Sequence, residues 1–178
     1  MKIEKIKKSS RAAYITTNIL KVMLIVCAIL AWLGGITVMG LGGIINQSFD
    51  KALKGGQMKE RDIAALKELT ERELGRRLME GENYAMTIGV YMMVFGIAIA
   101  LLALVLHFVS RVFKEFMESY SPFQPGILKN LKIALVLIVV YTAQSSLGIA
   151  LVIAMASWCI MNIFEYGCEL QKQSDETL

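Results

Sequence analysis

The chain has 178 residues, of which 56% are hydrophobic and 19% are charged, and its formal net charge is +4 at pH 7. A soluble domain averages about 45–50% apolar and about 25% charged residues, so this composition argues against a soluble protein and favours a membrane protein. No basic patch is interleaved with aromatic residues, so we expect the positive charge to meet an anionic lipid surface and not to bind nucleic acid directly.

The chain begins with a basic segment, residues 1–21, which carries six Lys and Arg side chains. The stretch that follows, residues 22–45, carries no charge. At about 1.5 Å per residue it is long enough to cross a hydrocarbon core of about 30 Å. It is also too long for the core of a cleavable signal and lacks a clear cleavage site, which predicts a first transmembrane helix.

A long loop follows at 46–83, where eight basic residues are balanced by eight acidic ones. Within it, residues 59–80 place Ile63, Leu66 and Leu74 on one face, a spacing that predicts an amphipathic helix. Two roles are open for this helix: a lid that packs on the spans, or a sensor for a ligand.

The second predicted span, 84–110, is uncharged along its whole length apart from His107 near its end. His107 fits either a hydrogen-bonded residue at the membrane interface or a proton or metal site, and the chain has no second His to share a metal. No Asp, Glu, Lys or Arg occupies the middle of any predicted span, which argues against ion-coupled transport.

Residues 111–126 form a predicted elbow. Its first part continues the amphipathic pattern, and Pro122 and Pro125 then interrupt the helix. Two caps are allowed here: Ser121 with Gln124 as a capping box, or Gln124 capping a helix that Pro125 begins.

The last apolar stretch, 127–167, is too long for one crossing of the bilayer and long enough for two. A polar patch at 141–148 predicts a turn, hence two spans at 127–143 and 147–167; one long helix is the alternative. The expected fold is all-α: a polytopic membrane protein with four transmembrane helices and an amphipathic helix in its first extracytoplasmic loop.

The chain ends in a charged, helical tail, residues 168–178. The N-terminal segment has six basic residues, residues 111–132 have four and the tail has one. The long loop at 46–83 has eight, which its eight acidic residues balance. Because cytoplasmic segments carry the excess of Lys and Arg, we expect both termini in the cytoplasm.

Small residues recur at helical spacing in the spans and predict close helix packing, within the chain or against a second copy of it. The predicted packing residues are Ala28, Gly35, Gly42, Gly89, Gly96, Ala100, Ala150 and Ala154. Catalytic and metal-binding motifs are missing, and the three cysteines show no metal or redox spacing. We therefore predict a non-enzymatic protein without a cofactor or metal.

Two short stretches, "SPFQPGILKNLKIA" before the third span and "IFEYGCELQKQSDETL" after the fourth, carry a family resemblance. The chain resembles the YoaS-like family, bacterial four-span membrane proteins of unknown function. The matching positions are Pro122, Phe123, Gln124, Gly167, Leu170, Asp175, Glu176 and Thr177. The resemblance implies a bacterial inner membrane, and genes of this family often lie beside one for a small Cro/cI-type helix-turn-helix regulator.

These observations lead to two functional hypotheses. In the first, the chain is a regulator that holds a small cytoplasmic transcription factor. The predicted docking residues are Arg111, Lys114, Phe123, Glu165 and Glu169. In the second, an apolar small molecule binds between the helices of a binding or transport-accessory protein.

Overall fold

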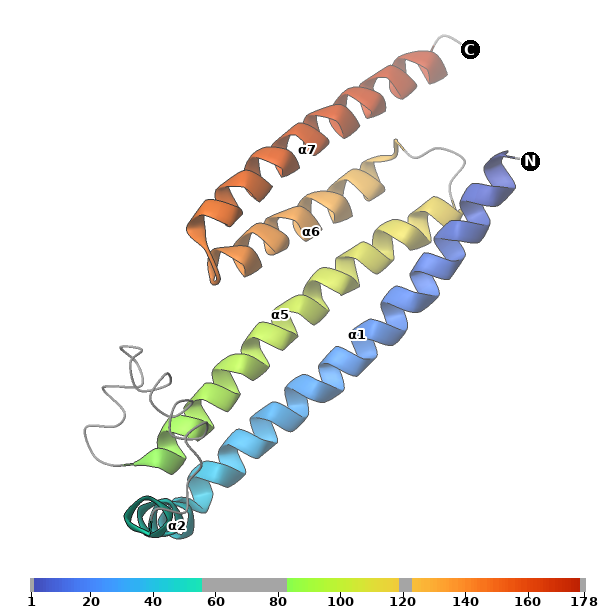
Figure 1. The fold of residues 1–178 in the computed structure, drawn as a ribbon. Coiled ribbons are helices and arrows are strands. Elements are labelled where there is room, and N and C mark those ends of the chain that lie inside the picture. Colours follow the sequence, from blue (N-terminus) through green and yellow to red (C-terminus); the bar gives the residue numbers. More distant parts are fainter. Residues whose placement is uncertain (1, 56–82, 119–122, 177–178) are drawn as a thin grey trace. The chain divides into compact units, whose positions relative to one another are not determined.

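The computed structural model describes residues 2–55, 83–118 and 123–176 (Figure 1). These residues form five helices, labelled as in Figure 1: α1 (Lys2–Gly40), α2 (Gly42–Lys54), α5 (Tyr84–Glu118), α6 (Pro125–Ala143) and α7 (Leu147–Glu176). Four stretches are long and apolar enough to cross a membrane: Lys7–Gly40 within α1, and the whole of α5, α6 and α7. The predicted all-α architecture with four spans is therefore confirmed, and the chain is a multi-pass membrane protein. The amphipathic helix predicted at 59–80 lies outside the described residues.

The chain divides into two compact units, Cys27–Ile97 and the combination of Met1–Val26 with Ala98–Leu178. In the first unit, the later part of α1 packs antiparallel against the early part of α5. Gly35 and Gly89 lie at this contact: a Cβ added to either glycine would come 2.8 Å from the backbone oxygen of the other. The two backbones thus approach closely because neither residue has a side chain, as small residues allow between membrane helices.

The first helix ends earlier than the apolar run that predicted the first span at 22–45. Its last residue is Gly40, Leu41 is a turn, and α2 begins at Gly42. Glycine costs about 1 kcal/mol relative to alanine in a helix interior, so the clustered glycines weaken the helix here. Gly42, predicted to pack inside a span, therefore lies in the first turn of α2.

Two asparagines and an aromatic pair connect α2 to the start of α5. Asn83 accepts a hydrogen bond from the Met86 N–H over 3.2 Å and caps α5, and the Asn46 side-chain oxygen accepts one from the Ala85 N–H over 2.9 Å. The Asn46 amide also donates to Asn83 Oδ1 over 3.1 Å, and Phe49 stacks on Tyr84.

In the second unit, α6 and α7 pack side by side as a hairpin. The turn consists of residues 144–146, where the Ser145 and Ser146 N–H groups each donate to the Thr142 carbonyl over 3.0 Å. Ser146 also accepts, through its hydroxyl, a hydrogen bond of 3.5 Å from the Ile149 N–H in the first turn of α7. Residues 127–167 thus contain two helices joined by a turn, and each helix is long and apolar enough to cross a membrane.

The charged tail is no separate element. The helix α7 runs for 30 residues to Glu176. At about 1.5 Å per residue it is longer than a hydrocarbon core of about 30 Å requires, and its charged end belongs to the same continuous helix.

At the elbow, α5 extends to Glu118 and α6 begins at Pro125 with Gln124 as its N-cap. The Gln124 backbone is extended, with φ −112° and ψ 147°, and its side chain makes no capping hydrogen bond. Pro125 in the first turn lacks only an N–H that the helix does not use. Ser121, the other half of the alternative capping box, lies outside the described residues.

Candidate functional site

A groove of about 410 Å³ runs between α6 and α7. Most of its wall is apolar, formed by Leu135, Val136, Val139 and Val140 of α6 and by Ala154, Trp158 and Met161 of α7. Four polar residues also line it: Lys132, Ser157, Asn162 and Glu165. We call these eleven residues the α6–α7 groove.

The polar residues lie mostly at one end of the α6–α7 groove. Lys132 is the first of the groove residues on α6, and Asn162 and Glu165 are the last of those on the antiparallel α7. Ser157 lies deeper and is buried. The Trp158 indole is 71% exposed and forms an outer wall. An apolar molecule with one polar end would match this distribution.

A second groove, of about 550 Å³, lies where the elbow meets the C-terminal part of α7. Phe123 forms its inner wall: the ring packs on Phe164 at a centroid distance of 5.7 Å, and a Cβ on Gly167 would collide with it. The groove, here called the elbow groove, is lined by Phe123, Gln124, Pro125, Cys168, Glu169, Gln171, Lys172, Asp175 and Glu176. Its three carboxylates outnumber its one lysine.

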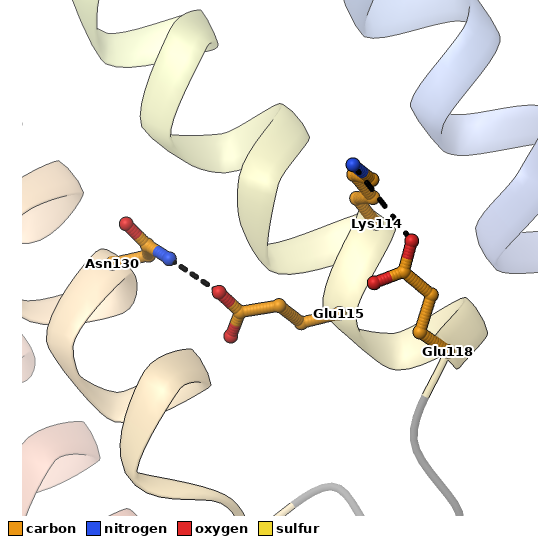
Figure 2. Close-up of polar contacts among 4 residues, drawn as sticks. All are labelled: Lys114, Glu115, Glu118 and Asn130. Atoms are coloured by element: carbon orange, nitrogen blue, oxygen red, sulfur yellow. Dashed lines mark hydrogen bonds and ion pairs between the residues drawn. The ribbon is translucent and has the colours of Figure 1, made fainter.

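A polar contact joins α5 to α6 close to the elbow (Figure 2). The Asn130 side-chain amide donates a hydrogen bond to Glu115 Oε1 over 2.6 Å, and Asn130 is only 8% exposed. The other carboxylate oxygen, Oε2, is buried, and a Cβ added to Gly126 would lie 2.9 Å from it. The neighbouring residue Lys114 forms an exposed ion pair of 3.8 Å with Glu118, one turn further along α5.

The predicted docking residues occupy different places. Phe123 and Glu169 meet in the elbow groove, whereas Glu165 lines the α6–α7 groove. Arg111 and Lys114 are exposed on α5 and line neither groove. The five residues thus lie in two grooves and on the exposed part of α5, and half-buried Phe123 packs against Phe164 and Gly167.

The predicted packing residues also differ in their surroundings. Gly35, Gly89 and Gly96 are buried between α1 and α5, where Gly96 lies against Trp32 and the Ala28 carbonyl. Ala150 is buried in α7, Ala154 lines the α6–α7 groove, and Ala100 is exposed.

Sequence reasoning missed the Glu115–Asn130 contact. Glu115 stands among Arg111, Lys114 and apolar residues, so the pattern suggested a solvated charge on an amphipathic helix. The available signal was an Asn one turn inside the next span, a costly position for an amide without a partner.

The cysteines Cys27 and Cys159 are exposed and Cys168 is half-buried, and all three are free thiols. Within the described ranges, no three His, Cys, Asp or Glu side chains lie together in a group that could hold a metal ion.

Residues 69–158 match the family model described as "Serpentine type 7TM GPCR receptor class ab chemoreceptor". The match covers just over half of the chain and includes all of α5 and α6 and the start of α7. The chain belongs to this serpentine chemoreceptor family. The family description gives seven spans, and the described residues contribute four helices of spanning length. No curated protein and no solved structure matches the chain.

Membership in the serpentine chemoreceptor family corrects the resemblance to the YoaS-like bacterial family, which is wrong. The stretches that suggested it have a structural explanation: Pro125 begins α6, and Phe123 packs against Phe164 and Gly167. Proline is common in the first turn of a helix, and an aromatic ring commonly packs over the preceding turn, so these residue types recur at helix junctions of unrelated membrane proteins. The bacterial membrane and the neighbouring regulator gene lose their basis with that resemblance.

Proposed function

We propose that this chain is a non-enzymatic membrane receptor that binds a small, mainly apolar molecule in the α6–α7 groove. The observation that carries the proposal is a groove of about 410 Å³ with apolar walls and a few polar groups gathered at one end. Pockets for small ligands typically have about 300–1,000 Å³ and this composition. Membership in a family described as chemoreceptors supports the same function.

The charges at the polar end favour a neutral ligand head. Lys132 and Glu165 both line that end. Glu165 attracts a cationic head group and Lys132 repels it, and the reverse holds for an anionic head group, so neither charge is favoured. Asn162 and Ser157 offer hydrogen bonds of either sense to a hydroxyl or carbonyl. A medium-chain alcohol, with a hydroxyl at one end of a flexible alkyl body, has this chemistry.

Ligand binding to the folded state raises its stability by mass action, by about 2.7 kcal/mol at a hundred times the dissociation constant. We expect decanol to raise the thermal unfolding temperature of the protein in lipid nanodiscs in a saturable way. Ala154→Phe, which fills the groove, should abolish this increase. Val152→Phe, on an exposed position of α7 outside the groove, should keep it. Equal responses of the two variants would contradict the proposal.

A second candidate function is docking of a cytoplasmic protein in the elbow groove. Its lining is acidic, with Glu169, Asp175 and Glu176 against Lys172, which is itself paired with Glu176 over 3.8 Å. A small DNA-binding regulator has a basic surface of complementary charge, so charge alone, and not the corrected resemblance, supports this candidate.

Deleting residues 168–178 should release such a regulator from the membrane when the two proteins are co-expressed. Glu169→Lys should weaken retention while leaving α7 intact, and Lys8→Glu, on an exposed position of α1, is the matched control for a change of charge. If the regulator stays with the membrane to the same extent for the deletion, for Glu169→Lys and for Lys8→Glu, the proposed docking at the elbow groove is wrong.

We also propose that both ends of the chain face the cytoplasm. The basic residues of 1–21 and 111–132 support this orientation, because Lys and Arg accumulate on the cytoplasmic side. The elbow groove then faces the cytoplasm, and the polar end of the α6–α7 groove lies in the inner half of the bilayer.

A further inference from the structure

A third groove, of about 450 Å³, lies between α1 and α5 within the unit formed by Met1–Val26 and Ala98–Leu178. Its lining consists of Lys21 and Ile25 of α1 and of Ala100, Ala103, Leu104 and His107 of α5. We call these six residues the α1–α5 groove. Neither functional candidate uses it.

The α1–α5 groove has a basic end and an apolar body. Of the described residues that line it, Lys21 and His107 are ionisable, and neither is acidic. Arg111, one turn further along α5 from His107, adds a guanidinium charge on the same side of this end of the helix. Away from this end, the groove is apolar. Ala100 and Ala103 have small side chains that leave space open, and Ile25 and Leu104 line the rest of the groove.

Lys21 is held at the groove by its own helix. Its ammonium group donates to Asn18 Oδ1 over 2.8 Å, and the Asn18 amide in turn donates to the Tyr14 carbonyl over 3.0 Å. An ammonium group has three donors. One hydrogen bond to Asn18 thus positions Lys21 and leaves it able to donate to an anionic oxygen in the groove.

We propose that the α1–α5 groove is a binding site for an anionic phospholipid, whose phosphate lies between Lys21 and His107 and whose acyl chain lies along Ile25, Ala100 and Leu104. Charge complementarity selects the head group, because the lining offers the Lys21 ammonium and the His107 ring to a phosphate and holds no carboxylate. The apolar body selects a lipid over a free anion. In the proposed orientation the basic end lies at the cytoplasmic leaflet, where anionic lipids concentrate.

Native mass spectrometry of the full chain, titrated with phosphatidylglycerol or with phosphatidylcholine of the same acyl chains, tests this site. We expect tighter binding of phosphatidylglycerol. Lys21→Met, which keeps the apolar stem and removes the charge, should weaken that binding about fivefold, the effect of one basic residue at a membrane surface. Lys129→Met removes an exposed lysine of α6 outside this groove and should leave the affinity unchanged.

Ala100→Phe provides a second variant, because it fills the groove at an exposed position without altering the charge. It should reduce phosphatidylglycerol binding while thermal unfolding shows that the protein remains folded. Equal losses in Lys21→Met and Lys129→Met would mean diffuse attraction to the surface and would overturn the proposal. Equal binding of the two lipids, or displacement of phosphatidylglycerol by inorganic phosphate alone, would overturn it as well.

Discussion

Asn130 of α6 and Glu115 of α5 are joined by a hydrogen bond of 2.6 Å, from the amide nitrogen to Oε1 (Figure 2). The two residues are on consecutive spans and flank the elbow. Because a carboxylate oxygen that loses a donor away from water is destabilised, this contact restricts how α5 and α6 can rotate against each other. The start of α6 is therefore held by a specific polar contact to α5 as well as by Pro125 in its first turn.

We predict that Asn130→Ala lowers the free energy of unfolding by about 1–3 kcal/mol, since Glu115 Oε1 loses a donor in a mainly buried site. Lys114→Ala is the matched control. It removes an ion pair whose side chains are 56% and 66% exposed, and water and salt screen such pairs to below about 1 kcal/mol. Thermal or denaturant unfolding in a fixed detergent measures both variants; equal destabilisation would contradict a structural role for the Asn130 contact.

The close approach of α1 and α5 yields a second prediction. Gly35→Ala places a Cβ 2.8 Å from the Gly89 carbonyl oxygen, and a backbone atom cannot move away cheaply. We expect a loss of about 1–3 kcal/mol in stability, the usual cost of overpacking.

Gly43 is the control for this substitution, because a Cβ there meets nothing within 4 Å. Gly43→Ala should leave stability unchanged or raise it by up to about 1 kcal/mol, since alanine favours a helix over glycine. If unfolding experiments rank Gly43→Ala as the more damaging change, α1 and α5 do not pack as described.

Cysteine accessibility measures the membrane orientation. In a chain with Cys27, Cys159 and Cys168 replaced by Ala, single cysteines at four exposed positions report the side of the membrane; these are Arg11, Gly55, Gln144 and Lys172. We expect a membrane-impermeant maleimide to label Gly55→Cys and Gln144→Cys on intact cells, and Arg11→Cys and Lys172→Cys only after lysis. Labelling of Lys172→Cys on intact cells would exclude the elbow groove as a cytoplasmic docking site.

Much of the fold could be predicted from the sequence because the bilayer dictates the length of its spans. The hairpin of residues 127–167 follows from the length of this stretch and from its one polar patch, and its turn lies at residues 144–146. The break at Leu41 was harder to place, because an uncharged run continues across it and only the clustered glycines mark it.

The grooves and polar contacts could not be predicted in the same way. Which face of α5 meets α6 depends on the rotation of both helices, so Glu115 and Asn130, fifteen positions apart, gave no periodic signal as a pair. The five predicted docking residues share a predicted membrane side, but Arg111 and Lys114 lie on α5 whereas Phe123, Glu165 and Glu169 line grooves formed with α7. The family resemblance failed for a related reason: it relied on short turn and cap residues, whose chemistry recurs at many helix junctions.

The two tryptophans allow the most direct test of the receptor proposal. Trp158 forms a wall of the α6–α7 groove, whereas Trp32 of α1 packs against Gly96 of α5. Trp32→Phe leaves Trp158 as the single tryptophan fluorophore, and Trp158→Phe leaves Trp32. Bromine quenches indole fluorescence only near contact, so a bromine-labelled decanol reports where the alcohol binds.

In nanodiscs, we predict saturable quenching of Trp158 at low mole fractions of the brominated alcohol, reversed by unlabelled decanol. Trp32 should show only weak quenching that increases in proportion to the alcohol dissolved in the lipid. Proportional, non-saturating quenching of both tryptophans would mean that the alcohol merely dissolves in the bilayer, and would contradict a ligand site between α6 and α7.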